Sequence, residues 1–265
     1  MNIQHITASI IASGLLALST APVWAETAEE KGLAISKEVK NRDQGWVDVS
    51  ASMNMVLRNK QGQESIREMR IKQLEVANDG DKSLNIFDKP RDVKGTAFLS
   101  FSHISGADDQ WLYLPALKRV KRIASRNKSG PFMGSEFSFE DLTSFEIAKF
   151  TYKYIKDEAC DLGTCFVIEQ YPTDKNSGYK KRVVWIDNEE YRMNKIDFYD
   201  RKNSLLKTLS SLEYNQYKGK FWRPSVMKML NHQNQKSTDL KWNSYEFGTG
   251  LSASDFNKNT LKRAR

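Results

Sequence analysis

Apolar and polar residues alternate along most of the chain, and this alternation predicts β-strands. Within the run from Trp46 to Leu57, every second residue from Val47 onwards is apolar, and polar residues fill most positions between them. A period of two places these apolar side chains on one face of a strand. Residues 59–62 supply a turn, and 66–76 form the returning strand. Similar runs follow at 84–87, 96–103, 110–114, 150–156, 165–171, 182–186, 191–199, 205–214, 221–230 and 239–247.

These runs are joined mostly by short turns, which predicts an antiparallel meander of about a dozen strands. Large flat open sheets are rare, so we expect the sheet to curl strongly. Residues 26–41 carry Leu33, Ala34 and Val39 among charges, which predicts an amphipathic N-terminal helix. The expected fold class is therefore mainly β with few helices (α+β).

Several strands carry apolar residues on both faces, so the inner face of the curled sheet is expected to be apolar and to be covered by other apolar groups. Side chains fill the interior of closed small barrels, and that is one interpretation. The other is an adaptable apolar wall around a cavity, favoured by methionines at positions 53, 55, 227 and 229.

Residues 111–142 interrupt the strand pattern with an aromatic run, a basic block and a segment rich in Gly and Phe. Ser138 and Asp141 are spaced as in a capping box, which predicts a short helix over 138–145. Gly130 and Gly134 precede this helix and would let it hinge. The segment is expected to cover the mouth of the sheet, either as a fixed cover or as a moving lid. The residues expected to line or cover the interior are Trp111, Tyr113, Leu114, Phe132, Met133, Phe137, Phe139 and Leu142.

The basic block has two interpretations. Its four members, Lys118, Arg119, Lys121 and Arg122, are either solvated charges on a turn or contacts for phosphate headgroups or an acidic partner. The net charge of the chain is +8. For an exported protein, such a charge favours anionic membranes, glycans or acidic proteins over nucleic acid.

Export is predicted from the first 25 residues, which contain no Asp, Glu, Lys or Arg. A short apolar run at 10–18 and the ending Val23-Trp24-Ala25 are typical of a secretory signal peptide cleaved after Ala25. The run is too short to span a bilayer comfortably, and no other stretch approaches that length. Residues 26–265 are then expected to form a single domain.

The two cysteines, Cys160 and Cys165, lie close together in the sequence. In an oxidising compartment this spacing predicts a disulfide that closes a hairpin. Such a short loop limits the stabilisation to about 2 kcal/mol.

The residues of the mature chain match no common catalytic motif. Only His103 and His232 follow the signal peptide, and neither HExxH, G-x-S-x-G, a phosphate-binding glycine loop nor CxxC occurs. The sequence therefore predicts binding rather than catalysis, with no metal and no cofactor. An enzyme acting on lipid or glycan is therefore a weaker hypothesis than the two binding functions described below, a carrier and a docking protein.

The runs DDQWLYLPALKRVKRI and GPFMGSEFSFEDL resemble the LolA-like family of periplasmic outer-membrane lipoprotein-sorting proteins. The likeness is to a branch associated with RND/MMPL-type exporters, and it extends to PRDVKGTAFL at 90–99, the cysteine hairpin and Trp222-Arg223-Pro224. It implies an incomplete, strongly curved barrel with helices closing one mouth over an apolar cavity.

The resemblance also implies a function: a periplasmic carrier that shields the acyl chains of a lipoprotein or lipid and delivers them towards the outer membrane. The expected partners are the acylated cargo, an inner-membrane RND/MMPL-type transporter and, transiently, a membrane; a monomer is expected. The alternative is an accessory protein that docks on the exporter through residues 118–122 without holding cargo.

Overall fold

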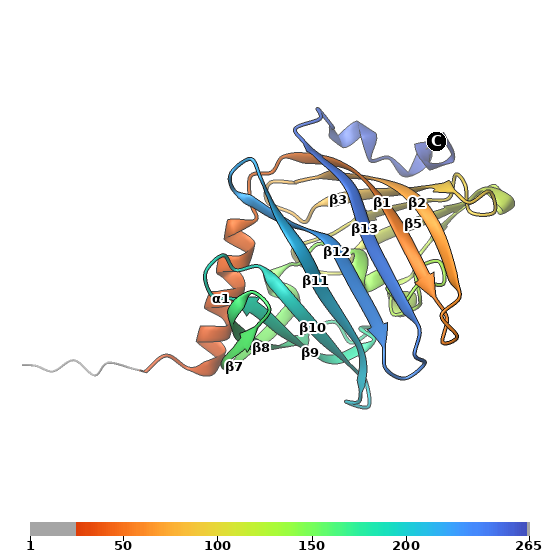
Figure 1. The fold of residues 1–265 in the computed structure, drawn as a ribbon. Coiled ribbons are helices and arrows are strands. Elements are labelled where there is room, and N and C mark those ends of the chain that lie inside the picture. The colour runs from red at the N-terminus through yellow and green to blue at the C-terminus, as the bar shows by residue number, and fades with distance from the viewer. Residues whose placement is uncertain (1–24, 264–265) are drawn as a thin grey trace, which may run out of the picture.

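The computed structural model describes residues 25–263, which form one strongly curved antiparallel sheet of thirteen strands (Figure 1). The sheet is not closed, because β6 and β7 are its two edge strands. The expected mainly β class, curved sheet and N-terminal helix are confirmed. The signal peptide predicted for residues 1–25 lies outside the described residues, apart from Ala25.

The sheet consists of two meanders joined in the middle. The first meander is β1 Asp48–Arg58, β2 Glu64–Leu74, β3 Lys82–Lys89, β4 Ala97–Phe101, β5 Asp109–Leu114 and β6 Arg119–Arg122. The second is β7 Phe150–Cys160, β8 Gly163–Pro172, β9 Tyr179–Asp187, β10 Met193–Asp200, β11 Leu205–Tyr217, β12 Phe221–Asn231 and β13 Ser237–Phe247.

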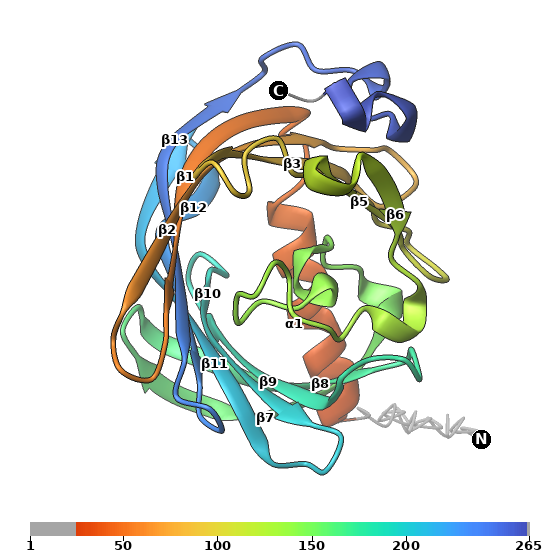
Figure 2. The same cartoon turned by 90° about the vertical axis from the view of Figure 1, so that its right-hand side faces the viewer.

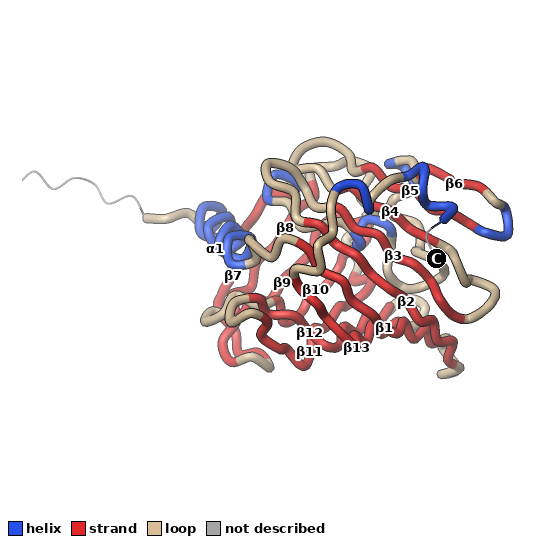
Figure 3. The backbone as a smooth tube through the Cα atoms, turned by 90° about the horizontal axis from the view of Figure 1, so that it is seen from above, coloured by secondary structure: helices blue, strands red, loops and turns tan. Residues whose placement is uncertain are grey.

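Pairing of β1 with β13 joins the two meanders, so the strand order runs β6-β5-β4-β3-β2-β1-β13-β12-β11-β10-β9-β8-β7. Within residues 25–263, helix is confined to α1 (Ala28–Arg42) and to short 3-10 turns (Figure 3). These turns are η1 Pro115–Leu117, η2 Ser125–Asn127, η3 Phe139–Leu142, η4 Ile147–Lys149, η5 Ala253–Asp255 and η6 Lys258–Arg263.

The alternation in β1 produces the predicted buried face. Val49, Ala51, Met53 and Met55 all lie in the main hydrophobic core on the concave side of the sheet. Met229 is also in that core and Met227 packs against it, so the methionines singled out from the sequence do gather there. Val47 departs from the pattern: it precedes β1 with φ 66° and is 60% exposed.

Helix α1 begins at a complete capping box and packs against β7. The Thr27 hydroxyl accepts a hydrogen bond from the Glu30 amide at 3.1 Å, and the Glu30 carboxylate accepts one from the Thr27 amide at 2.9 Å. Gly32 lies directly against the backbone of β7, where an added Cβ would meet the Tyr154 nitrogen at 2.8 Å. The absence of a side chain at residue 32 therefore sets how closely the helix approaches the strand.

The C-terminal segment covers part of the outer face of the sheet, which the sequence pattern did not predict. Phe256 and Leu261 are buried there in a second core with Leu84, Ile86 and Leu99. Residues of η6 contact β4, β5 and β6. Strands β3 to β5 thus carry apolar residues on both faces, because each face has its own cover.

The remaining local predictions have mixed outcomes. Cys160 and Cys165 form the predicted disulfide at the end of the β7–β8 hairpin. The short helix predicted over 138–145 is wrong in extent, because η3 covers only four residues, although its Ser138–Asp141 capping box is present. The basic block was not among the predicted strands, yet Arg119–Arg122 pairs with β5 as edge strand β6. Within residues 25–263, no helix has both the length and the apolar character needed to cross a membrane.

Replacing Gly32 by alanine tests the α1–β7 contact. Alanine normally stabilises a helix interior by roughly 1 kcal/mol relative to glycine. Here the new Cβ would press on the β7 backbone, so we expect Gly32→Ala to lower the free energy of unfolding in urea. Ala34 is exposed on the same helix, and Ala34→Gly should lose roughly 1 kcal/mol by propensity alone. Stabilisation by Gly32→Ala would contradict the close packing.

Candidate functional site

The chain between the two edge strands crosses the concave side of the sheet. We call residues 123–149 the lid segment; Figure 2 shows most of it, in green, within the curve of the sheet. Its Phe132 and Phe137 are 1% and 3% exposed and belong to the main core. The predicted cover over the mouth is therefore a segment that enters the interior.

An aromatic cluster attaches the lid segment to the first meander. The Phe132 ring lies 5.8 Å from that of Phe87 on β3 and 5.1 Å from that of Phe98 on β4, while Phe139 lies 5.6 Å from Phe98. The Arg67 guanidinium on β2 donates to the Met133 carbonyl. Burial of large aromatic side chains is a strong source of stability, so this cluster holds the tip of the lid segment in the interior.

The backbone of the lid tip folds back on itself. The Phe132 amide donates to the Phe137 carbonyl at 2.7 Å, and the Phe139 amide donates to the Gly130 carbonyl at 3.2 Å. The turn between them places Met133 and Gly134 at φ 50° and 77°, a region in which glycine is readily accommodated. These hydrogen bonds hold Phe132 and Phe137 next to each other in one compact turn.

A buried ion pair attaches the lid segment to the second meander. The Lys207 ammonium on β11 donates to Asp141 Oδ2 at 2.7 Å, and both side chains are about 5–6% exposed. The Tyr179 hydroxyl donates to Asp141 Oδ1 at 2.8 Å, and the Ser138 amide donates to Oδ2 at 2.7 Å. Burial opposes ionisation of Asp141, but Lys207 and Ser138 outweigh it and hold its pKa below the usual value.

Further polar contacts extend the attachment to β12 and β13. Lys207 also donates to the Glu136 carbonyl at 2.8 Å. The Glu136 carboxylate accepts from Asn231 Nδ2 at 2.7 Å, and its amide donates to Thr238 Oγ1 at 3.0 Å. The lid segment thus has an apolar attachment to one meander and a polar attachment to the other.

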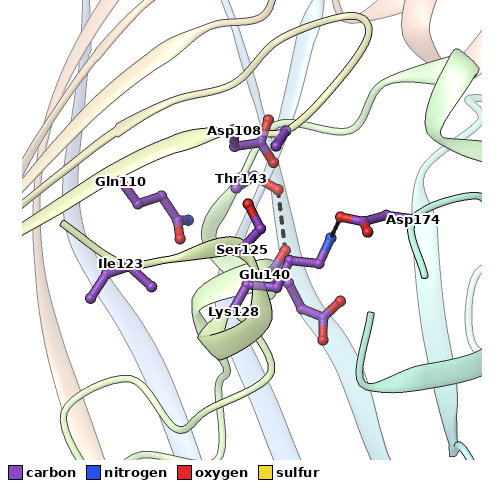
Figure 4. Close-up of a pocket in the computed structure, with 9 residues that line it drawn as sticks. Asp108, Gln110, Ile123, Ser125, Lys128, Glu140, Thr143 and Asp174 are labelled. Atoms are coloured by element: carbon purple, nitrogen blue, oxygen red, sulfur yellow. Dashed lines mark hydrogen bonds and ion pairs between the residues drawn. The ribbon is translucent and has the colours of Figure 1, made fainter. Parts of the chain in front are cut away.

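Glu140 lines a separate polar recess, which the lid segment forms together with Asp108, Gln110 and Asp174 (Figure 4). Burial raises the pKa of its carboxyl, which accepts hydrogen bonds from the Ser177 hydroxyl at 2.7 Å and the Gly178 amide at 2.8 Å. Lys128 pairs with Asp174 at 2.7 Å nearby. The recess measures about 10 Å³, enough for roughly one water molecule. It is not an acyl-chain site.

The structure divides the predicted cavity residues between two faces of the sheet. Phe132 and Phe137 lie in the main core, and Leu114, Met133, Phe139 and Leu142 pack against it. Trp111 and Tyr113 lie on the opposite face in the second core, with the Trp111 ring 5.2 Å from Phe101. The prediction that these two side chains line the interior is therefore wrong. Side chains alternate along β5, and those of Leu112 and Leu114 point into the interior instead.

The basic block is exposed at the edge of the sheet. Lys118, Arg119, Lys121 and Arg122 are all exposed, and Arg122 pairs with Asp109 at 2.5 Å. Among the described residues, the other three form no ion pair. Charged edge strands also discourage pairing with other chains, so the block has a structural role besides any contact with a partner.

Sequence reasoning missed cations that face the interior, among them Lys207 and Arg182. Lys207 lies on the same face of β11 as the core residue Leu209. Arg182 lies on the same face of β9 as the core residues Val184 and Ile186. A charged residue at an apolar phase of a strand was the available signal. Among the described residues, no group of three or more His, Cys, Asp or Glu side chains is arranged to hold a metal ion.

Comparisons with known proteins agree with this geometry. A family model described as "Uncharacterized protein" matches residues 79–263. The crystal structure of a protein domain from Vibrio parahaemolyticus, assigned to outer membrane lipoprotein sorting, is 61% identical, with a TM-score of 0.87 over 89% of this chain and 100% of its own. None of the curated proteins matches this chain.

Two further structures share the fold. A DUF1329 family protein from Desulfovibrio piger is 26% identical, with a TM-score of 0.84 over 89% of this chain and 99% of its own. A LolA superfamily protein from Nitrosomonas europaea is 18% identical over the same shares, with a TM-score of 0.68, and shows likeness of fold alone. The chain belongs to the family of the Vibrio outer membrane lipoprotein-sorting domain and has a LolA-like fold, as the sequence resemblance predicted.

Removing one partner of the buried ion pair should loosen the lid segment. Asp141→Asn leaves the Lys207 ammonium buried without its counterion, and we expect a loss of about 3–5 kcal/mol in the free energy of unfolding at pH 7. Because the folded pKa of Asp141 lies below its unfolded value, the wild-type advantage should shrink as pH falls below about 4. Urea titrations at several pH values measure both effects.

Asp174→Asn is the matched control. It breaks the ion pair between Lys128 of the lid segment and Asp174, whose side chain is 32% exposed. A pair this accessible contributes less than about 1 kcal/mol. Equal losses in the two variants would contradict the assignment of Asp141–Lys207 as the main polar attachment.

Proposed function

We propose that the protein is a periplasmic carrier of the acyl chains of a lipoprotein or lipid, which it delivers towards the outer membrane. In this proposal the acyl chains take the interior volume that Phe132 and Phe137 fill in the structure. The observation that carries it is a segment that crosses an unclosed sheet, brings its own aromatic side chains, and is attached separately to each meander. The 61% identical Vibrio domain, assigned to lipoprotein sorting, supports the same role.

Energetics explain why such cargo needs a container and why the container needs a lid. Each exposed methylene costs roughly 0.8 kcal/mol, so a dozen amount to about 10 kcal/mol. A concave face without the lid tip would expose to water Phe87 and Phe98, whose rings lie against Phe132. The aromatic lid tip covers them until acyl chains replace it, so apolar surface stays covered in both states.

The basic block is the surface through which we propose that the protein contacts a membrane or a transporter. The basic block lies at the edge of the sheet with exposed Leu117 beside it, and it offers contacts to anionic headgroups or to an acidic face of an RND/MMPL-type transporter. We propose that the carrier works as a monomer and contacts membranes transiently. The proposed role is binding rather than catalysis.

A second candidate is an accessory protein that docks on the exporter and never holds cargo. The observation that favours it is that the aromatic lid tip already fills the interior. The two candidates differ in one respect: the carrier requires the lid segment to leave, whereas the docking protein requires it to stay.

Locking the lid segment in place separates the two candidates. Glu136→Cys combined with Thr238→Cys places two thiols at the contact where the Glu136 amide lies 3.0 Å from Thr238 Oγ1. For a carrier, we expect the oxidised variant to lose retention of a fluorescent diacyl lipid in gel filtration and to regain it on reduction. Wild type under both conditions controls for the native Cys160–Cys165 bridge. Full retention by the oxidised variant would contradict a lid that must leave.

Charge reversal of the basic block tests its proposed contacts. The triple change Lys118→Glu, Arg119→Glu and Lys121→Glu should weaken sedimentation with vesicles containing phosphatidylglycerol, since each basic residue contributes about 1 kcal/mol near an anionic surface. Retention of lipid in gel filtration should be unchanged, because the block lies outside the interior. An unaltered vesicle affinity would leave the block with its structural role at the sheet edge alone.

A further inference from the structure

A lateral row of side chains crosses the concave face of the second meander beneath the lid segment. Cross-strand register places its members opposite one another on six neighbouring strands. The row consists of Tyr152 on β7, Gln170 on β8, Arg182 on β9, Phe198 on β10, Lys207 on β11 and Asn231 on β12. Two cations therefore stand two strand spacings apart, on a face that is otherwise largely apolar.

The first cation, Lys207, receives its counterion from the lid segment. Asp141 is that counterion, and the ammonium lies 5.3 Å from the centroids of both the Tyr179 and Phe198 rings. Removal of Asp141 with the lid would leave Lys207 at an apolar surface with no carboxylate partner. Such a cation is costly to leave unpaired.

The second cation, Arg182, has no carboxylate partner among the described residues. It donates only to Gln170 Oε1, from Nε at 3.1 Å and from Nη2, and its guanidinium lies 4.1 Å from the centroid of the Phe150 ring. The residue is partly accessible, and its Nη1 donates to no described residue. Burial lowers the pKa of Arg182, and Asp141 is the foremost of the charges that oppose this effect. One carboxylate thus acts on both cations.

We propose that the Asp141 carboxylate occupies the position of a ligand's anionic group, and that a phosphate-bearing lipid headgroup pairs with Lys207 and Arg182 once the lid segment leaves. This inference rests on the proposed carrier function and names its substrate class. A guanidinium with free N–H donors and an ammonium suit a phosphate well. The acyl chains of the same molecule would lie in the volume vacated by Phe132 and Phe137, which makes the ligand an anionic amphiphile.

The exchange also explains how a strongly attached lid segment can leave. When Asp141 departs, one negative charge is replaced by another, so Lys207 is never left unpaired. A neutral lipid would displace the aromatic tip but leave Lys207 without a counterion. Selectivity for an anionic headgroup follows from that difference.

The test compares retention of two fluorescent lipids with identical acyl chains, phosphatidylglycerol and diacylglycerol, after gel filtration of the full mature chain. Wild type should retain phosphatidylglycerol at least roughly tenfold more tightly, because hydrogen bonds to charged groups are stronger than those between neutral groups. Arg182→Gln should abolish most of this preference, by weakening the retention of phosphatidylglycerol far more than that of diacylglycerol. Arg182→Lys should restore part of it, which also separates loss of charge from a defect in folding.

Lys181→Gln is the matched control. Lys181 precedes Arg182 on β9 but pairs with Glu169 on the other face of the sheet, so its loss removes the same charge without touching the row. It should keep the wild-type preference. A preference that falls equally in both variants would overturn the inference, since net charge alone would then explain it.

The remaining outcomes are distinct. Retention of both lipids by wild type with no preference would overturn the headgroup site and leave the carrier function standing. Retention of neither lipid would overturn the carrier function and this inference with it. Calorimetric binding of inorganic phosphate that depends on Arg182, without any preference among lipids, would assign the site to free phosphate and overturn the lipid headgroup.

Discussion

The strand order imposes one constraint on which the rest of the structure depends. Strands β6 and β7 are consecutive in the chain yet lie at opposite edges of the thirteen-stranded sheet. The chain that joins them must therefore cross the open side of the curve. Because the concave face is apolar, a crossing segment is stable there only if it contributes apolar groups of its own, and Phe132 and Phe137 do so. Cover, core and candidate binding volume are thus consequences of one connection.

The two attachments of the lid segment differ in chemistry, and this difference gives the proposed exchange its logic. Aromatic contacts to β3 and β4 are non-directional, so acyl chains can replace them without matching their geometry. The pair between Asp141 and Lys207 is directional and charged, so only another anion replaces it without leaving a buried cation. An amphiphile with apolar chains and a phosphate supplies both substitutes at once.

Much of the fold could be predicted from period-two alternation, because strands such as β1 have one buried face. Strand β6 could not, since its four residues are mostly basic and reveal no apolar phase. The sequence also could not show on which face of the sheet the Trp111 side chain lies. Strand β5 is apolar on both sides, and its outer cover comes from Phe256 and Leu261, about 145 residues later in the chain. Phe132 and Phe137 were found from composition, whereas Lys207 and Arg182 were missed because the strand phase was read for apolar residues alone.

Amide hydrogen exchange of the lid tip, with and without a bound anionic diacyl lipid, tests the central claim most directly. In the unloaded protein the Phe132 and Phe139 amides are held by the Phe137 and Gly130 carbonyls within the core, so they should exchange slowly. If acyl chains replace the tip, residues 130–139 should become the region whose exchange accelerates most on loading, while β1 and β13 stay protected. Retention of lipid with unchanged protection of these amides would show that cargo binds elsewhere and would contradict the account.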